Sequence, residues 1–248
     1  MSADLVASIY CHCKNALTCS KCGTPMPTRE DTKVVMNSLN DRPANANVFG
    51  NGALVVSDIP KSCREKEPVI VGVDEAGRGC VLGPMVYGAA YWSAEHSQKN
   101  MKIPKGFNDS KQLSDETRRK LYQQILDHDD IGFVMRAFSA GEISRNMLRT
   151  EPYNLNQMSH DATFCMIRKL LDGGLNIQTC YIDTVGIAAH YQRKLEQEFP
   201  GVAFVVESKA DAKYAPCSAA SVGTYSTIQY NTIQYQVLLV QNVTTSLD

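Results

Sequence analysis

The sequence feature that most constrains the fold is a repeated one: apolar segments of this chain end in acidic residues. The segment 69–73, Val-Ile-Val-Gly-Val, runs directly into Asp74 and Glu75, the segment 180–182 runs into Asp183, and the segment 202–206 is followed a few residues later by Asp211. Short apolar runs rich in Val and Ile are typical of buried strands. Because strand ends converge on a common crevice in an open α/β sheet, the pattern predicts that these acids meet at one sheet edge.

Strand and helix signals alternate along the middle of the chain. We expect strands over Pro68–Val73, Met85–Trp92, Gly132–Phe138, Cys180–Asp183 and Val202–Glu207, and helices opening at Ser114 and covering Asn156–Leu171 and Ala188–Phe199. The helices are predicted from apolar residues at helical spacing, and the pair Gly173 and Gly174 ends the second of them. Two successive strands followed by alternating helices and strands indicate an α/β fold with a mixed sheet flanked by helices.

Composition divides the 248 residues into three zones. Residues 1–65 are rich in Asn, Pro, Ser, Thr and Cys and show little periodicity, which predicts a disordered, low-complexity extension. Residues 66–222 carry the strand and helix signals and form the predicted catalytic domain. Residues 223–248 contain no Lys or Arg and repeat Thr-Ile-Gln-Tyr, so we interpret them as a divergent tail.

Bulk properties exclude few functions. An apolar content of 44% is ordinary for a globular chain with a real core, and a net charge of −1 neither supports nor excludes a nucleic-acid partner. No run of 18 apolar residues predicts a membrane span, and Met1–Tyr10 lacks the basic start of a secretory signal. The nine cysteines are therefore expected to be reduced.

A cluster of carboxylates has a definite chemistry. Several acids held together repel one another unless a cation neutralises them. Oxygen-only ligation suits Mg²⁺ or Mn²⁺, and two such ions about 4 Å apart favour phosphodiester hydrolysis. The alternative is that each acid caps a helix or ends a strand, as Asp often does.

The turn Gly77-Arg78-Gly79 follows the first acid pair directly. Its glycines allow the backbone to approach a nucleotide closely, and the arginine can bind a phosphate through two hydrogen bonds. An ordinary tight turn with a solvated arginine remains the alternative. The spacing is not a dinucleotide-binding fingerprint.

Seven blocks of the sequence form a specific pattern: Asp-Glu-Ala-Gly-Arg-Gly at 74–79, Val-Leu-Gly-Pro-Met-Val-Tyr-Gly at 81–88, Asp-Ser-Lys at 109–111, Tyr-Asn-Leu-Asn-Gln-Met-Ser-His-Asp at 153–161, Tyr-Ile-Asp-Thr-Val-Gly at 181–186, Ser-Lys-Ala-Asp-Ala-Lys-Tyr at 208–214 and Ser-Ala-Ala-Ser at 218–221. This pattern resembles the type 2 ribonuclease H family, and the block at 81–88 resembles its eukaryotic catalytic subunits in particular. The blocks occur in the family's order over about residues 66–222.

The resemblance implies a ribonuclease H-like fold with a five-stranded mixed sheet. It implies hydrolysis of the RNA strand in RNA–DNA hybrids, incision at ribonucleotides embedded in duplex DNA, and roles in DNA replication and ribonucleotide excision. The implied catalytic and metal-binding residues are Asp74, Glu75, Asp183 and Asp211, and the implied substrate-binding residues are Gly77, Arg78, Gly79, Lys111, Asn154 and Asn156. The glycine turn would contact the ribose 2′-hydroxyl, the group that distinguishes RNA from DNA locally.

The family pattern also implies two accessory subunits, which dock largely on the C-terminal side, and residence in the nucleus, with the cytoplasm as a second compartment. This sequence departs from the pattern at Cys80, where the family usually has proline, and after Val222. The second departure leaves open an inactive isoform that only binds nucleic acid or accessory subunits. A different metal-dependent nuclease of related fold is less favoured, because the glycine turn follows the acid pair directly.

Two further groups carry weaker signals. Cys11, Cys13, Cys19 and Cys22 have a spacing that allows a Zn²⁺ site, although reduced thiols in a disordered extension are the favoured interpretation. His160 lies inside the predicted helix, beside Asp161. We interpret it as a solvated or capping residue, with a position near the site as the alternative.

Overall fold

The computed structural model describes residues 54–64, 66–79, 84–98, 113–151 and 153–228. Its labelled elements are β1 (Leu54–Val56), η1 (Lys61–Cys63), β2 (Pro68–Ala76), β3 (Met85–Ser93), α3 (Ala94–Gln98), α4 (Asp115–Asp127), β4 (Gly132–Phe138), α5 (Ala140–Met147), α6 (Leu155–Asp172), β5 (Asn176–Asp183), α7 (Ala188–Glu198), β6 (Ala203–Glu207) and α8 (Ala210–Lys213). A further helix occupies residues 215–228. None of the helices in these ranges has the length and apolarity that crossing a bilayer requires.

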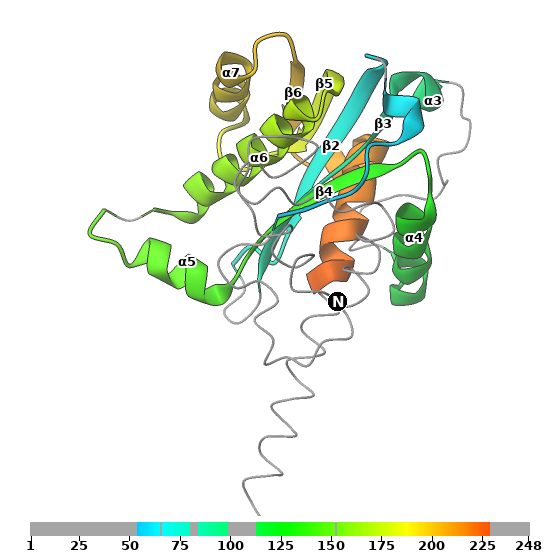
Figure 1. Cartoon of the computed structure of the whole chain (residues 1–248). Helices are drawn as coiled ribbons and strands as arrows, with labels where there is room; N and C mark the ends of the chain where they lie inside the picture. Colours follow the sequence, from blue (N-terminus) through cyan, green and yellow to red (C-terminus); the bar gives the residue numbers. More distant parts are fainter. Residues whose placement is uncertain (1–53, 65, 80–83, 99–112, 152, 229–248) are drawn as a thin grey trace, which may run out of the picture.

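One mixed sheet organises the elements. Its strands lie in the order β1-β4-β3-β2-β5-β6, in which β2 pairs antiparallel with β3 and parallel with β5. Figure 1 shows α6 and α7 on one side of the sheet, and α4 with the orange helix 215–228 on the other. Each side has its own apolar cluster, one centred on α6 and α7 and one on α4 and residues 219–222. The predicted α/β class with a mixed sheet is confirmed.

The sheet has six strands where the family pattern implied five, and the added edge strand is β1. It lies within residues 1–65, which we predicted to be disordered, and it pairs antiparallel with β4, with Val55 opposite Met135. Its three apolar residues are too few to show a period, and they are stabilised by pairing rather than by local propensity. For residues 54–64 the prediction of disorder is therefore corrected.

Helix 215–228 lies unusually close to the sheet. A Cβ added at Gly72 in β2 would lie 2.1 Å from the backbone nitrogen of Cys217, and one added at Gly88 in β3 would lie 2.6 Å from the Thr224 methyl. The two glycines therefore leave the space that the helix backbone occupies. This helix continues without a break past Val222, where composition placed a domain boundary. Residues 223–228 thus belong to the packed structure rather than to a separate tail.

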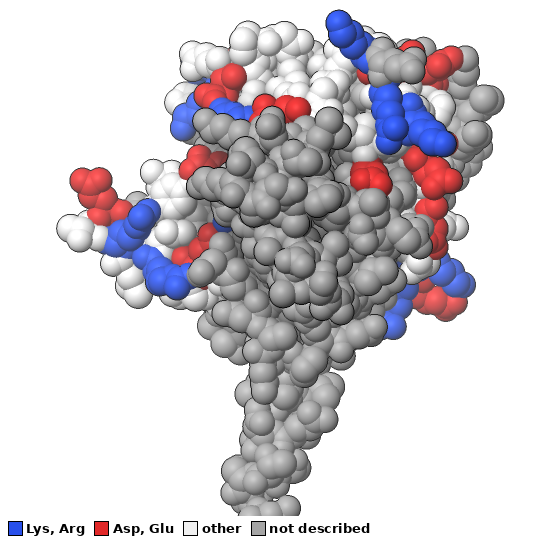
Figure 2. Space-filling view, in the orientation of Figure 1, with Lys and Arg blue, Asp and Glu red and all other residues white. Residues whose placement is uncertain are grey.

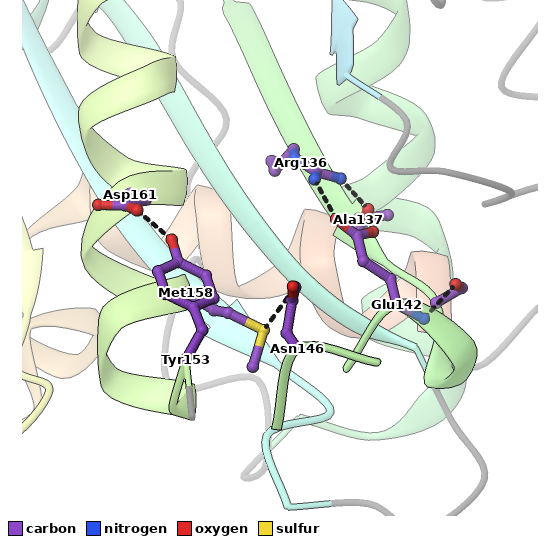
Figure 3. A network of polar contacts seen from close by, with 8 residues as sticks. Arg136, Ala137, Glu142, Asn146, Tyr153, Met158 and Asp161 are labelled. Atoms are coloured by element: carbon purple, nitrogen blue, oxygen red, sulfur yellow. Dashed lines mark hydrogen bonds and ion pairs between the residues drawn. The ribbon is translucent and has the colours of Figure 1, made fainter. Parts of the chain in front are cut away.

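Helix α5 joins β4 to α6, and none of its residues is buried. Polar contacts fasten it (Figure 3): the Arg136 guanidinium donates to Glu142 Oε1 at 2.7 Å, and Asn146 Nδ2 lies 3.7 Å from the Met158 sulfur. Since α5 lacks a buried apolar stripe, hydrophobic periodicity did not predict it. Its position depends on side chains from β4 and α6.

Candidate active site

Asp74 and Asp183 end neighbouring strands. The register of the parallel pair β2 and β5 places Val73 opposite Ile182, so the next residue of each strand is one of the two acids. Residues one apart in a strand point to opposite faces, and Asp74 therefore shares its face with Gly72, over which helix 215–228 packs. The predicted meeting of strand ends occurs for these two acids.

Asp74 is 6% exposed, and its surroundings disfavour its charge. Burial, followed by the nearby Glu75 and Asp183 carboxylates, raises the pKa of Asp74 well above its ordinary value. Hydrogen bonds from the Ser221 hydroxyl and from the Glu75 backbone N–H act in the opposite direction, the latter at 2.8 Å. A buried carboxyl beside other acids is destabilised as an anion, and a bound cation relieves that cost.

The residue before Asp211, Ala210, connects this part of the chain to Asp183 through its backbone N–H. Lys209, with a left-handed φ of 58°, turns the chain from β6 into α8. The turn directs the Ala210 N–H to Asp183 Oδ1 at 3.2 Å, and the next residue, Asp211, is 7% exposed. The Ser218 hydroxyl donates to the Asp211 carbonyl, which ties α8 to helix 215–228.

Glu75 points to the other face of the sheet. It lies opposite Tyr87 in the antiparallel pairing of β2 with β3, and burial together with the Glu75 charge raises the pKa of Tyr87. Within the ranges described, no group of three or more His, Cys, Asp or Glu side chains has the arrangement to hold a metal ion. Asp74 and Asp183 thus end adjacent strands, and Asp211 follows the residue whose N–H binds Asp183, but the described residues do not close the four acids into a ligand set.

The donor set nevertheless fits a divalent cation. All four predicted ligands are carboxylates, and Mg²⁺ and Mn²⁺ prefer oxygen ligands. The raised pKa of Asp74 is the observation that tests the fit, because an acid cluster without a compensating charge favours protonation.

The glycine turn follows β2. Gly77 and Gly79 have φ values of 77° and 86°, a region that residues with side chains rarely adopt. A Cβ at Gly77 would lie 2.1 Å from the Pro84 carbonyl oxygen and 2.5 Å from the Ile228 methyl, whereas no atom of the described residues lies within 4 Å of one at Gly79. Glycine is thus required at position 77 both for its positive φ and because a side chain would not fit there. At position 79 it is required for its positive φ alone.

The remaining predicted substrate-binding residues have different positions. The Arg78 guanidinium donates to Asn156 Oδ1 in the first turn of α6, so these two come together. Asn154 is the N-cap of the same helix, and its side chain accepts the Gln157 N–H at 3.0 Å. Such a cap stabilises the helix, so an asparagine at this position is explained without a role in substrate binding. Lys111 and the four cysteines at 11, 13, 19 and 22 lie outside the described residues.

Two residues near the acids were not predicted to have a site role. Ser221 hydrogen-bonds Asp74, and only the family block at 218–221 marked it beforehand. His160 is neither solvated nor a helix cap, because it stacks on Tyr191 with ring centroids 4.0 Å apart. Its four-residue spacing from Asn156 was the available signal. In the view of Figure 2, Lys and Arg lie among Asp and Glu on the described surface rather than in one basic patch.

Comparison with known proteins agrees with this fold. The crystal structure of the ribonuclease H2 from Pyrococcus horikoshii OT3 superposes with a TM-score of 0.55 at 28% identity, covering 68% of this chain and 75% of that one. The structure of Bst-RNase HIII in complex with Mn²⁺ has a TM-score of 0.54 at 23% identity, covering 70% of this chain and 56% of that one, a likeness of fold alone. The class of protein is therefore a ribonuclease H-like α/β protein.

The family follows from the sequence comparison. The family model described as Ribonuclease HII matches residues 71–228, which is more than half of the chain, and the chain belongs to that family. It is 42% identical over 168 residues to the A subunit of ribonuclease H2 from Homo sapiens, covering 67% of this chain and 54% of that protein. The protein of the same name from Arabidopsis thaliana is 38% identical over 156 residues, covering 63% and 52%. The chain thus spans about half the length of these curated relatives.

Proposed function

We propose that this chain hydrolyses the RNA strand of RNA–DNA hybrids and incises duplex DNA at embedded ribonucleotides. The residues that would hold two divalent ions, Mg²⁺ or Mn²⁺, are Asp74, Glu75, Asp183 and Asp211. The observation that supports this most is the position of Asp74 and Asp183 at adjacent strand ends, where burial and neighbouring acids raise the pKa of Asp74. When bound, such ions supply an activated water and stabilise the departing oxygen.

The residues of the chain supply position and charge. Asp74 is held by Ser221 and by the Glu75 backbone, and Asp183 Oδ1 accepts the N–H groups of Thr184 and Ala210 at 3.1 and 3.2 Å. The hydrogen bonds to Asp74 favour its anionic form, the form that a cation requires. They also fix the carboxylates relative to the backbone, so less ordering remains when an ion binds.

The glycine turn would provide the selectivity for RNA. Gly77 and Gly79 leave no side chain between their backbone and a ribose, and Arg78 is held against α6 by Asn156. Backbone amides that face the 2′-hydroxyl can bind it as donors or acceptors, which DNA cannot satisfy. The turn follows Glu75 after a single residue, Ala76, so the recognised ribose would lie beside the acids.

The alternative is an inactive form that only binds nucleic acid or accessory subunits. It is less favoured, because all four acids are present and both the family match and helix 215–228 extend to residue 228, beyond Val222, where the sequence was expected to depart from the family. That helix brings Ser221 to Asp74 and Ile228 to Gly77, two contacts on which an intact site would depend.

The decisive experiment is cleavage of a duplex containing one embedded ribonucleotide by the purified chain in Mg²⁺ or Mn²⁺. Asp74→Asn should reduce the rate by on the order of 100-fold or more, as loss of a group that stabilises charge in a transition state does. Asp172→Asn, a change at the exposed end of α6, should leave the rate unchanged. Equal rates for the parent and Asp74→Asn proteins would refute the assignment.

Stability provides a second measurement on the same variants. In metal-free buffer Asp74→Asn should melt at or above the parent temperature, since it removes a buried acid that its neighbours destabilise. If the variant is inactive but as stable as the parent, the loss of activity comes from the missing carboxylate and not from unfolding. A large fall in melting temperature would indicate that Asp74 is structural.

We propose partners and a compartment on the family resemblance. The human and Arabidopsis relatives are named as one subunit of ribonuclease H2, and such a name implies other subunits. Co-expression with two accessory subunits should give a complex that co-elutes, and a tagged chain should be found in the nucleus, with the cytoplasm as the second compartment. Elution as the free chain would refute the assembly.

A further inference from the structure

A tyrosine of β3 is hydrogen-bonded to the start of α6. The Tyr87 hydroxyl donates to Ser159 Oγ at 2.6 Å, and the Ser159 hydroxyl donates in turn to the Leu155 carbonyl at 2.6 Å. Leu155 is the first residue of α6. Because a serine hydroxyl has one proton, which here goes to Leu155, its oxygen is free to accept from the tyrosine. The two hydroxyls form a relay from the sheet to the first turn of the helix, the Tyr87–Ser159 relay.

The relay lies inside the protein. Tyr87 is 2% exposed and Ser159 is 0% exposed, so water does not compete for their hydrogen bonds. Burial, followed by the nearby Glu75 charge, raises the pKa of Tyr87, and its hydroxyl therefore keeps the proton that it donates. A buried hydroxyl that loses its partner is costly, which makes the relay a directional attachment rather than an incidental contact.

The first turn of α6 also reaches the candidate site. Asn156, the residue after Leu155, accepts a hydrogen bond from Arg78 of the glycine turn. A capping box between Asn154 and Gln157 closes this helical turn, but its bonds are internal to the helix and do not set where the turn lies on the sheet. The Tyr87–Ser159 relay supplies that attachment, because Tyr87 belongs to β3.

The contacts form a closed circuit around the end of β2. Tyr87 lies opposite Glu75 in the antiparallel register, and Arg78 follows Glu75 by three residues along the chain. The path from Glu75 to Tyr87, through Ser159 into α6 and from Asn156 to Arg78 thus returns to the same strand end. The glycine turn is held by the chain on one side and by α6 on the other. Its two glycines with positive φ are intrinsically permissive, so the second restraint matters.

We propose that Tyr87 and Ser159 are positioning residues, which hold the first turn of α6 against β3 and, through Asn156, keep Arg78 in place for the substrate. This role rests on the proposed function, because the position of Arg78 matters for hydrolysis only if the glycine turn binds the hybrid. Neither hydroxyl would touch the substrate. A displacement of about 1 Å in a group that orients a substrate can lower a rate by up to about 100-fold, so the relay should be measurable in cleavage.

Four substitutions separate the relay from the packing of α6. Tyr87→Phe keeps the ring and removes the donor, and Ser159→Ala removes the oxygen in the middle. Asn156→Ala removes the contact with Arg78 directly. Thr163→Val is the matched control, since Thr163 is also 0% exposed and also donates to the carbonyl four residues before it, that of Ser159, at 3.2 Å. It removes a buried hydroxyl of the same helix and leaves the relay in place.

The first readout is hydrogen exchange of residues 77–79 in the full-length protein without metal or substrate. We expect exchange about 10-fold faster than in the parent for Tyr87→Phe, Ser159→Ala and Asn156→Ala, and parent-like exchange for Thr163→Val.

The second readout is cleavage of a duplex with one embedded ribonucleotide. Tyr87→Phe and Ser159→Ala should each lower kcat/KM by about 10-fold, and the double variant should lose no more than either one, because both changes break the same relay. In an Asn156→Ala background, Tyr87→Phe should change kcat/KM by less than about 2-fold, since the contact through which it acts is already absent.

The outcomes are distinct. Parent-like exchange or parent-like cleavage in Tyr87→Phe would overturn the proposal. So would an equal loss in Thr163→Val, or a full further loss in the Asn156→Ala background, since either result assigns the hydroxyls to the general packing of α6. If the parent protein does not cleave but the exchange differences appear, the proposed function fails while the positioning of the glycine turn is supported. Melting curves ensure that folded proteins are compared, and Tyr87→Phe, which keeps the ring, carries the test if Ser159→Ala does not fold.

Discussion

Replacing Gly72 with alanine perturbs the contact that holds helix 215–228 against the sheet. The added Cβ would lie 2.1 Å from the Cys217 nitrogen and 2.6 Å from the Pro216 Cβ, and the backbone atoms among these neighbours cannot rotate away. Ordinary contact begins at 3.4 Å, so the helix must retreat by about 1.3 Å at this point. The same helix presents Ser221 to Asp74, and its displacement therefore reaches the acids.

The magnitude follows from overpacking. One methyl group forced into a filled core costs about 1–3 kcal/mol, and a clash with backbone belongs at the upper end of that range. The lower chain entropy of unfolded alanine returns about 0.5–1 kcal/mol. The net loss in the free energy of unfolding is about 2 kcal/mol, which lowers the melting temperature of a chain of this size by roughly 4–8 °C.

Thermal melts of the full chain in metal-free buffer measure this directly. Gly141→Ala is the control, because its Cβ would meet only the Ser139 hydroxyl at 4.0 Å and alanine favours the helix by up to about 1 kcal/mol. We expect the Gly141 variant to melt at or slightly above the parent temperature. A Gly72→Ala protein that melts within about 1 °C of the parent would show that the helix is not held as closely as described.

Three further predictions concern single contacts. Tyr225→Leu removes the ring that lies 4.3 Å below the Arg118 guanidinium and should cost about 0.5–2 kcal/mol in urea unfolding, whereas no loss would exclude a cation–π contribution. Glu142→Gln breaks a largely buried ion pair with Arg136 and should cost about 1–3 kcal/mol, and a double-mutant cycle with Arg136→Met should give a coupling of similar size rather than additivity. Folding buries His160 and lowers its pKa, so the folded state binds fewer protons than the unfolded state does. This residue therefore stabilises the fold above about pH 6.5, its pKa in the unfolded chain. The contribution disappears as the pH falls through the pKa of the folded state. His160→Phe should accordingly lose less stability than the parent between pH 7.5 and about 5.5 in chemical unfolding, and an unchanged pH dependence would contradict this.

Much of the fold was predictable because its signals are local. The strands β2, β3, β4 and β6 and the helices α6 and α7 begin and end within a few residues of the predicted positions, and α4 begins directly after Ser114, where a helix was predicted to open. Strand β5 begins at Asn176 rather than Cys180, since parallel pairing with β2 starts at Pro68 and extends the strand beyond its apolar part. The first turns of α4 and α6 follow caps at Ser114 and Asn154 that local hydrogen bonds explain.

The end of helix 215–228 was not predictable from composition. Residues 223–227, Gly-Thr-Tyr-Ser-Thr, are poor helix formers, and nothing local favours their burial. In the structure the Thr224 hydroxyl donates to the Ala220 carbonyl at 3.0 Å and the Thr227 hydroxyl to the Gly223 carbonyl at 2.8 Å. These bonds satisfy the two threonine hydroxyls inside a buried helix, and packing against the sheet stabilises it where propensity does not.

The sequence by itself determined the chemical groups of the site and the strand ends that carry them, because an acid directly after an apolar run is a matter of neighbours along the chain. Tertiary structure alone decided which groups face one another: Asp74 toward Ser221, Glu75 toward Tyr87, and His160 toward Tyr191. Strand alternation separates residues that are adjacent in sequence, and helix packing joins residues that are distant. Whether the four acids close around a cation depends on those contacts.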